Sequence, residues 1–592
     1  MPTAREVIEA YRRLGPGGFA RAGGRLIGTQ ARLPLRRARL RVAPIRVSPE
    51  TLRRALAPNW RERALAALPA VSAWEPEPDN VLARAEPLMR HEFDLLGSGP
   101  TALGREIDWH TDFKTGRTWP LAHISRLPIS YPDASDIKVP WELSRCQHLP
   151  ILASAYRHTG DQRYLDEIGV QLESFIAANP VEIGPCWACT MDVAIRATNW
   201  VATLALVPDR EWTAPVLQSL LLHGRFIRSH LEWGEVRGNH YLSDVAGLLP
   251  IAALFPNEGW QQWAARELVA EMAHQVRPSG VDHEMSTGYH RLVTELFVRG
   301  TEAAQALGQT FPETYLEGLD RMQGFITAYT RPDGLAPIVG DEDSGRFLPL
   351  SDYGGDPRDH SQLAGAHPGH DFDGFHVMRR GDLYVLARCG DTGLHGIGGH
   401  AHNDQLSFEL CFGDQAMVVD PGAYLYTADP SARNLFRSTA FHSTMQIDGA
   451  EQNELRSDYL FTLPDRTKAE VIARDSATFE GRHHGFPGAL HVRRLELVSD
   501  GLVVRDRAEG GRTLEWCFPL APGCTVAAEP GRVIANWGKA ALTIESPGLP
   551  FHVDRGWYSP RYGVREETSF VRAGRTRAAA TDATEFVLRA SR

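Results

Sequence analysis

The chain changes its secondary-structure pattern once, after Pro332-Asp333-Gly334. Before this point apolar residues recur every three or four positions, which is typical of amphipathic helices. After it, short β-rich runs alternate with turn residues. A run of helices followed by a run of strands predicts separate all-α and all-β domains. A length of 592 residues also favours two or three domains over a single core.

The helical half contains many segments of similar length. We interpret the apolar spacing from Leu143 to Tyr156 as one helix and Gly160-Asp161 as the start of the next. Further helices are expected at 188–206, 212–231, 240–254, 259–274, 286–307 and 313–330. Short links between similar helices favour hairpins stacked in a ring or solenoid over a small bundle. The sequence shows no fixed period that would indicate an exact repeat family.

The second half contains the predicted strands, at 383–388, 405–412, 415–419, 492–498, 502–507, 514–520 and 586–588. Asp500-Gly501, between two of these runs, is a strong hairpin signal. We therefore predict four parts, namely an N-terminal arm (1–85), a helical domain (86–340), a linker (341–372) and a β-domain (373–592). The arm contains a basic stretch from Arg21 to Arg41, which we interpret as a solvated, partly extended segment packed on the next domain.

Composition narrows the class of partner. A net charge of -10 argues against nucleic acid, because phosphate binding normally needs a basic surface. A local basic groove on an acidic protein can still bind an anionic glycan. No stretch of about 18 apolar residues predicts a membrane span, and the N-terminus lacks an apolar signal core. We expect a cytoplasmic protein, or a periplasmic one if the start or the export route is misread.

The seven cysteines do not form a disulfide framework, because they are sparse and odd in number. Cys186 and Cys189 have the spacing of a redox pair or a zinc knuckle, but no second such pair exists. We interpret them as two small buried thiols near a helix start.

The densest chemical signal is the stretch from Gly399 to Leu410, in which His400 and His402 precede an alternating run. In a strand these two histidines would share a face, because side chains repeat every two residues. This pattern suggests a metal site or an acid/base site.

Three other polar clusters each have a structural and a functional interpretation. In the segment 237–241, Asn239 is either a helix N-cap or part of a substrate groove. The segment 282–290 is either a capping segment before a buried Tyr289 or a second part of the site. The acidic turn 340–344 is interpreted as mainly structural.

Taken in order, these segments resemble the heparinase II/III family of polysaccharide lyases and the related alginate and oligoalginate lyases. The motifs that carry the resemblance are Asp136 to Arg145, Asn239-His240, Tyr289-His290, the His400-x-His402-x-Asp404 stretch, Asp420-Pro421-Gly422 and His442-Ser443-Thr444. The likeness runs from about residue 105 to 450 and more loosely beyond. It implies an incomplete (α/α) toroid followed by an antiparallel β-sandwich domain, an α+β multidomain chain with the substrate cleft between its parts.

The resemblance also implies a reaction, β-elimination across a bond to a uronic acid, which leaves a 4,5-unsaturated uronate. Such an enzyme must neutralise the uronate carboxylate, because removing the C5 proton adds charge beside it. The catalytic residues implied are Asn239, with His240 as its helper, and Tyr289 and His400 for proton transfer. A phenol with an ordinary pKa near 10 is a ready acid, while His240 could serve as base for one uronate epimer. The order of acid and base stays open.

The family's zinc ligands correspond to His402, Asp420 and His442, and imidazole with carboxylate suits zinc in a structural role. A simple hairpin closed at Gly413-Asp414 would leave Asp420 several residues along the strand from His402. The two can meet only if His402 lies in a loop that bends back.

Candidate substrate contacts complete the prediction. Trp141, Trp187, Tyr424 and Tyr426 could stack on sugar rings, and Arg145, Arg196 and Arg437 could bind acidic groups. For each aromatic residue taken alone, core packing is the commoner role. The expected partner is an anionic polysaccharide or oligosaccharide, non-sulfated or lightly sulfated, and a homodimer is left open.

Two other functions fit the same residues. One is a zinc hydrolase in which His400, His402 and Asp420 activate water. The other is a non-catalytic glycan-binding protein of exopolysaccharide handling.

Overall fold

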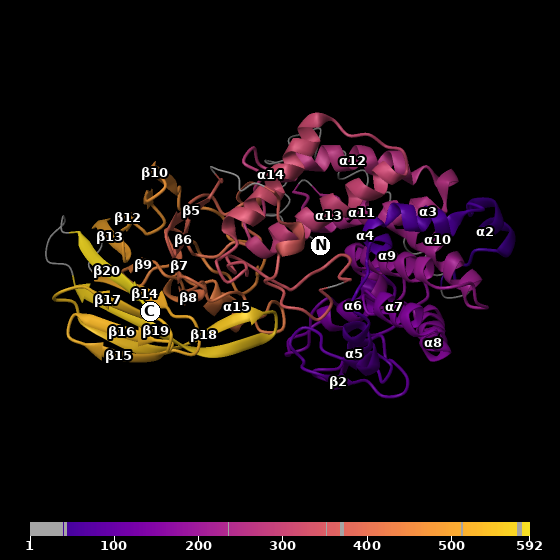
Figure 1. Cartoon of the computed structure of the whole chain (residues 1–592), viewed down its shortest axis with the longest axis horizontal. Coiled ribbons are helices and arrows are strands. Elements are labelled where there is room, and N and C mark those ends of the chain that lie inside the picture. Colours follow the sequence, from indigo (N-terminus) through magenta and orange to yellow (C-terminus); the bar gives the residue numbers. More distant parts are fainter. Residues whose placement is uncertain are drawn as a thin grey trace.

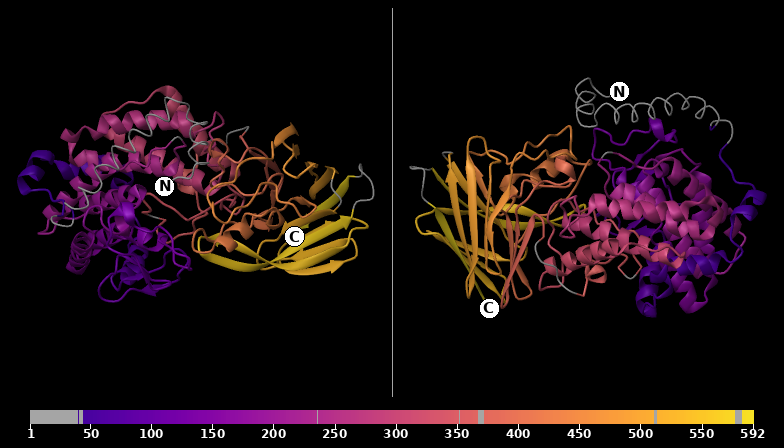
Figure 2. Two further views of the ribbon diagram at one scale, coloured as in Figure 1. Left: turned by 180° about the vertical axis from the view of Figure 1, so that it is seen from behind. Right: turned by 90° about the horizontal axis from the view of Figure 1, so that it is seen from above.

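The computed structural model describes residues 40, 44–234, 236–350, 352–366, 372–510, 513–576 and 583–592. Most helices lie at one end of the molecule and most strands at the other (Figure 1). The two further views show the same separation (Figure 2). About 36% of the described residues are helical and 22% are in strands. The basic stretch of the predicted arm lies outside the described residues, apart from Leu40.

The helices follow one another along the first half of the chain. Their bounds are α2 Pro49–Ala55, α3 Trp60–Ala67, α4 Pro69–Ser72, α5 Pro78–Leu88, α6 Lys138–Ser144, α7 Leu149–Thr159, α8 Gln162–Ala178, α9 Thr190–Leu206, α10 Thr213–Ser229, α11 Asn239–Leu254, α12 Trp260–Gln275, α13 Thr287–Ala306 and α14 Glu313–Tyr329. The six predicted helices between 188 and 330 are confirmed to within two residues at each end.

Local chemistry explains the boundary between α7 and α8. Gly160 ends α7 with a left-handed φ of 69°, which glycine adopts without a Cβ penalty. The carboxylate of Asp161 then accepts the backbone N–H of Arg163 and caps α8. The predicted start at Gly160-Asp161 is confirmed.

The single helix predicted from Leu143 to Tyr156 is wrong. The chain turns between α6 and α7, where Cys146 has a φ of 53°. Leu143, Cys146, Leu149 and Leu152 nevertheless belong to one core. The apolar spacing therefore reflects two helices that bury side chains in one core, and not one continuous helix.

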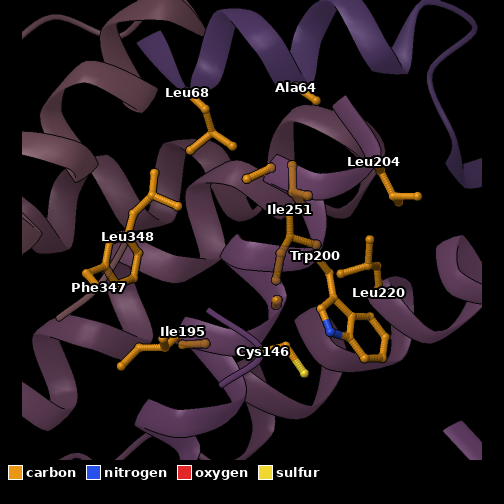
Figure 3. Close-up of a cluster of buried hydrophobic side chains, with 14 of the residues drawn as sticks. Ala64, Leu68, Cys146, Ile195, Trp200, Leu204, Leu220, Ile251, Phe347 and Leu348 are labelled. Carbon is orange, nitrogen blue, oxygen red and sulfur yellow. The ribbon is translucent and has the colours of Figure 1, made fainter. Parts of the chain in front are cut away.

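Helices α9 and α11 lie in the middle of the helical half, where α11 contacts α9, α12, α13 and α3. Figure 3 shows the core that they share, with Trp200 and Ile251 beside Ala64 and Leu68. Helices α2 to α5 are thus part of this core, and the predicted arm boundary at 85 falls inside α5. Arg63 also donates from Nε to the carbonyl of Ala253 at 2.6 Å.

The second half contains three larger antiparallel sheets. The first has the order β5-β6-β7-β8, with bounds Phe375–Arg380, Leu383–Arg388, Phe408–Phe412 and Gln415–Val418. The second has the order β10-β11-β12-β13-β20-β17-β16-β15, with bounds Glu470–Arg474, Thr478–His483, Leu490–Leu497, Gly501–Glu509, Thr584–Ser591, Ala541–Glu545, Arg532–Asn536 and Thr525–Glu529. The third has the order β18-β19-β14-β9, with bounds Phe551–Arg561, Val564–Thr576, Thr513–Pro519 and Met445–Ile447.

Side chains from all three sheets form one core, which includes Val385, Leu495 and Trp516. The hairpin predicted at Asp500-Gly501 is confirmed, with Leu497 paired to Leu502. Two short pairs lie in the first half of the chain, β1 Glu92–Phe93 with β2 Thr101–Ala102, and β3 Thr111–Asp112 with β4 Arg117–Thr118.

Apolar clusters join the two halves. Phe325 and Tyr329 of α14 pack with Phe375 of β5, and Val139 of α6 packs with Tyr562 in the β18–β19 turn. The Tyr562 hydroxyl also donates to Asp136 at 2.7 Å. Within the described ranges, no helix combines the length and apolar character needed to cross a membrane.

Candidate active site

Tyr289 and His400 come from different halves of the molecule and stack on each other. Their ring centroids are 3.7 Å apart with an interplanar angle of 18°. Tyr289 lies in the first turn of α13, where the hydroxyl of Ser286 accepts its backbone N–H. His400 lies in the loop that precedes β7. The stack therefore forms only when the two halves are together.

The surroundings of Tyr289 keep its phenol in the neutral form, which can donate a proton. Its hydroxyl donates to Asp343 Oδ2 at 3.1 Å, and Lys138 Nζ donates to the same oxygen at 2.7 Å. Burial, together with the carboxylates of Asp343 and Asp341, raises the pKa of Tyr289 well above its ordinary value. Burial opposes ionisation of Asp343, but Lys138 and Arg145 override it and lower the pKa of this carboxyl. At neutral pH Tyr289 is a neutral phenol facing an anion.

Asp341 lies between the two histidines of the Gly399–Leu410 stretch. Its Oδ2 is 3.0 Å from His400 Nδ1, and its Oδ1 is 3.2 Å from His402 Nε2. Arg433 of α15 (Pro430–Phe436) donates to both oxygens, at 2.9 and 2.7 Å. Burial opposes ionisation, yet Arg433 and the two histidines hold the pKa of Asp341 well below its usual range. Asp341 is therefore an anion that accepts from both rings.

The glycine before Asp341 is required by this arrangement. Gly340 has a φ of 77°, and a Cβ added there would lie 2.8 Å from the carbonyl oxygen of His400. The backbone N–H of Asp341 donates to that same carbonyl at 2.9 Å.

Asn239 is the first residue of α11 and pairs with Glu284. Its backbone N–H donates to Glu284 Oε1 at 2.6 Å, and its Nδ2 lies 3.0 and 2.9 Å from the two carboxylate oxygens. Glu284 Oε2 is also 3.3 Å from His400 Nε2. A Cβ on Gly238, the N-cap of α11, would lie 2.3 Å from Glu284 Oε1. Gly238, and not Asn239, is therefore the N-cap, and its missing side chain makes room for Glu284.

His240 follows on the exposed side of α11. Its Nδ1 is 3.2 Å from Glu232 Oε2, and its side chain is 50% exposed. Desolvation by the surrounding protein works to lower the pKa of His240, but the Glu232 carboxylate overrides it and raises the pKa to about 9. His240 is thus a cation at neutral pH.

The structure brings His402, Asp420 and His442 together. One potential ligand atom of each lies within 4.8 Å of the other two, and all three side chains are buried. Asp420 follows β8, and His442 follows the turn Thr439–Phe441. His402 lies in a loop and not in a strand, so the predicted requirement that it bend back towards Asp420 is met.

The donor set of this triad fits a metal. His442 Nδ1 is 3.1 Å from Asp420 Oδ2, while His442 Nε2 and His402 Nδ1 have no hydrogen-bond partner among the described residues. Because Asp341 accepts from His402 Nε2–H, the lone pair of this ring is on Nδ1, facing the triad. Two imidazoles and one carboxylate are typical ligands of Zn²⁺.

A second group, Cys189, Glu232 and His240, has similar spacing. Burial raises the pKa of the Cys189 thiol well above its ordinary value, so it is protonated at neutral pH. This group suits a metal less well than the triad. Both Cys186 and Cys189 are buried free thiols.

The predicted substrate contacts fall into two sets. Trp187, Arg196, Arg437 and Tyr426 are buried. Arg196 donates to the carbonyl of Cys186, and Arg437 donates to the carbonyls of Leu460 and Thr462, so both serve the protein's own packing. Arg145 pairs with Asp192 at 2.6 Å and Glu142 at 2.7 Å. Trp141 and Tyr424 are partly exposed.

Several members of the cluster lacked an individual role in the sequence-based prediction, namely Lys138, Glu284, Asp341, Asp343 and Arg433. Asp341 and Asp343 lie in the acidic turn interpreted as mainly structural. Two exposed aromatic residues were also missed. Trp233 is 54% exposed beside Glu232, and Phe461 is 40% exposed with its ring 6.2 Å from that of His400. The signal available in the sequence was an aromatic residue close to polar residues.

The site is therefore a largely buried acid/base cluster built between a helical half and a strand-rich half. Residues 48–348 match the family model described as heparinase II/III N-terminus, and residues 366–587 match the heparinase II/III-like C-terminal model. The chain belongs to the heparinase II/III family.

Two known relatives are consistent with membership of this family. A heparin-sulfate lyase from Pedobacter heparinus is 23% identical over 405 residues, 62% of this chain and 57% of the relative. A heparin-sulfate lyase from Bacteroides stercoris is 21% identical over 437 residues, 64% of this chain and 61% of the relative. The chain thus spans less than two thirds of the length of each.

Solved structures show the same fold. A structure of heparinase III has a TM-score of 0.69 at 16% identity, covering 92% of this chain and 94% of the other. A mutant of heparan sulfate lyase from Pedobacter heparinus has a TM-score of 0.57 at 19% identity, covering 90% and 87%.

Proposed function

We propose that this protein is a polysaccharide lyase that cleaves a uronate-containing glycan by β-elimination and leaves a 4,5-unsaturated uronate end. The observation that carries the proposal is the stack of Tyr289 on His400. Glu284 contacts both His400 and Asn239, and the cationic His240 follows Asn239 in the chain. Family membership supports it, as do the two relatives named heparin-sulfate lyases.

The uronate carboxylate would be bound beside α11. A cationic His240 offsets the charge that develops next to this carboxylate when the C5 proton leaves. Glu284 orients Asn239 by accepting from its backbone N–H and from Nδ2, and the second N–H of Nδ2 would donate to the uronate. Electrostatic stabilisation of this kind is worth most in a buried, preorganised site.

Two protons must move, and the hydrogen bonds suggest how. The neutral phenol of Tyr289 is suited to protonate the departing glycosidic oxygen. Asp341 accepts from His400 Nδ1–H, so Nε2, on the side of Glu284 and Asn239, is the atom that can accept the C5 proton. We therefore assign Tyr289 as acid and His400 as base, and His240 to carboxylate binding.

We assign the zinc site to His402, Asp420 and His442. Bound there, Zn²⁺ would act as a structural cross-link and a fixed positive charge, because all three ligands are buried while catalytic zinc sites keep an open position. The orphaned nitrogens of His402 and His442 support this assignment. The loop that carries His402 also carries His400, so the triad would orient both.

We also propose a more detailed architecture for the two halves of the chain. We assign the helical half to an incomplete (α/α) toroid and the strand half to an antiparallel β-sandwich. The helices packed around α9 and α11, and the three sheets that share one core, support it.

The substrate is assigned by charge and exposed aromatic surface. Trp233 and Phe461 are placed to stack on sugar rings, with Trp141 and Tyr424 as further contacts. Arg145, Arg237 and Arg433 each pair with carboxylates of the chain itself. A non-sulfated or lightly sulfated uronate glycan suits this charge distribution better than a densely sulfated one.

The experiment is a panel of heparan-type, hyaluronan-type, alginate-type and bacterial exopolysaccharide substrates, followed by ultraviolet absorbance of the C4–C5 double bond. We expect unsaturated product from at least one polymer. Hydrolysis without absorbance would favour the zinc hydrolase, and binding without turnover would favour the glycan-binding protein. The buried triad and the contacts of His400 with Asp341 and Glu284 argue against the hydrolase.

A further inference from the structure

Three histidines meet at a second place, where the helical half touches the loop that leads to His400. They are His274 near the end of α12, His283 before α13, and His395 in the turn Leu394–Gly396. Their ring centroids are 5.2 to 5.6 Å apart. One ring nitrogen of each lies within 4.8 Å of the other two.

The less exposed members of this group have ring nitrogens that lack an ordinary hydrogen bond. His283 is 4% exposed, and its ring nitrogens make no hydrogen bond of normal geometry in the part of the chain that the structure describes, with only a minor contribution from the backbone of Arg237. His274 Nε2 likewise lacks a hydrogen-bond partner among the described residues. An unpaired buried polar group is destabilising, so a cation that accepts these lone pairs would stabilise the folded chain. His395 is exposed and closes the group on the solvent side.

The charges around the group are compatible with a cation. Burial, with nearby positive charge, lowers the pKa of His274 to about 4 and that of His283 to about 3, so both are neutral at pH 7. The two neighbouring guanidinium groups are already paired. Arg237 donates to Glu271 at 2.7 Å, and Arg277 donates to Asp391 at 2.9 and 2.6 Å.

We propose that His274, His283 and His395 form a second transition-metal site, which takes Zn²⁺ or a similar late first-row divalent ion through three imidazole nitrogens. Imidazole is the preferred ligand of such ions. In a tetrahedral site with metal–nitrogen distances of about 2.1 Å, ligand nitrogens are about 3.4 Å apart. The three nitrogens lie within 4.8 Å of one another, so binding would draw all three rings closer together, with the exposed His395 able to rotate.

The position of this site gives it a structural role. The backbone N–H of Leu394 donates to the carbonyl of His283 at 2.7 Å, so the turn already rests on the segment before α13. Gly393 leaves no room for a side chain, because a Cβ there would lie 2.4 Å from that carbonyl. A metal bound by the three histidines would fasten the beginning of the loop 393–400 to α12, five residues ahead of His400.

The test uses tag-free full-length protein stripped of metal and titrated with Zn²⁺ alone, with bound equivalents measured by calorimetry. His395→Gln is the main variant because the residue is exposed, and His283→Gln removes a buried ligand. His552→Gln, at an exposed histidine on β18, is the matched control. Circular dichroism verifies that each variant is folded.

We expect the wild type and His552→Gln to bind one more equivalent per chain than His395→Gln, or to bind it at least ten-fold more tightly. A titration with Co²⁺, followed by the visible absorption of the bound ion, should show the same difference in binding. Equal stoichiometry and affinity in the wild type and a folded His395→Gln would overturn the proposal. The comparison is independent of lyase activity and of the triad at His402, which all four proteins retain.

Discussion

His400 and His402 bond to opposite oxygens of one carboxylate, that of Asp341. The shared acceptor fixes both rings with an N–H directed at Asp341. It leaves Nε2 of His400 3.3 Å from Glu284, which also binds Asn239, and leaves Nδ1 of His402 without a hydrogen-bond partner among the described residues. One anion thus separates the histidine that we propose for proton transfer from the histidine that we propose as a metal ligand, two residues away.

Replacing Asp341 with Asn should damage both folding and turnover. The change leaves the buried guanidinium of Arg433 without its anion, and breaking a buried pair in this way costs about 3–5 kcal/mol. Denaturant unfolding measures the loss, and product absorbance measures activity. The matched control is Asp458→Asn, which removes an exposed partner of Arg456 and should change stability by less than about 1 kcal/mol. A stable, fully active Asp341→Asn protein would contradict the assigned role.

Tyr289→Phe should leave the fold intact and lower kcat by roughly 10²- to 10⁴-fold, the usual contribution of a positioned acid. The ring still stacks on His400, and Asp343 keeps its contact with Lys138. Tyr315→Phe, which removes a buried hydroxyl bonded to Thr301 in α13, is the control and should retain turnover. Wild-type kcat in Tyr289→Phe would remove Tyr289 from the mechanism.

The KM for an anionic substrate should rise as pH increases through about 9. The pKa of His240 is raised to about 9, so the ring is protonated below that pH and loses its charge above it. Glu232→Gln removes the neighbouring carboxylate, which should lower this pKa and move the rise in KM to lower pH. His240→Gln should have a higher KM at pH 7 and lack this alkaline dependence. A pH profile unchanged by Glu232→Gln would show that His240 does not set substrate affinity.

Chelation of the zinc that we propose at the His402 triad should lower the thermal unfolding midpoint of the protein. Buried ligands without a metal leave polar nitrogens unpaired, so dialysis against a strong chelator should destabilise the protein and Zn²⁺ should restore it. His395→Gln should show the same chelator effect at this triad, whereas Asp420→Asn should lose most of it. Metal-free protein with an unchanged midpoint would argue against a structural zinc there.

The fold was largely predictable where the sequence signal is local. The six helices from 188 to 330 depend on an apolar stripe, and the hairpin at Asp500-Gly501 depends on turn chemistry, so both follow from short segments. The turn at Cys146 was missed because helices on both sides bury side chains in the same core. Periodicity alone does not reveal a break of that kind.

The site was less predictable, because its key contacts are long-range. Asp341 and Asp343 form an ordinary acidic turn in the sequence, and only the folded chain brings them to His400, Arg433 and Lys138. Glu284 is similar, since its partner Asn239 lies 45 residues earlier. The resemblance to a family supplied the candidate catalytic residues and ligands, but no sequence pattern pointed to the residues that orient them.

The position of Asp341 has a consequence for modularity. It lies at the start of the segment predicted to be a linker, yet its partner Arg433 belongs to α15 in the strand half. A chimaera that joined the helical half of one relative to the strand half of another at this segment would separate the carboxylate of Asp341 from its ion-pair partner, Arg433. Recombination between relatives should therefore succeed only where the incoming half supplies an equivalent of Arg433. The segment that begins at Asp341 is thus part of the site and does more than connect the two halves.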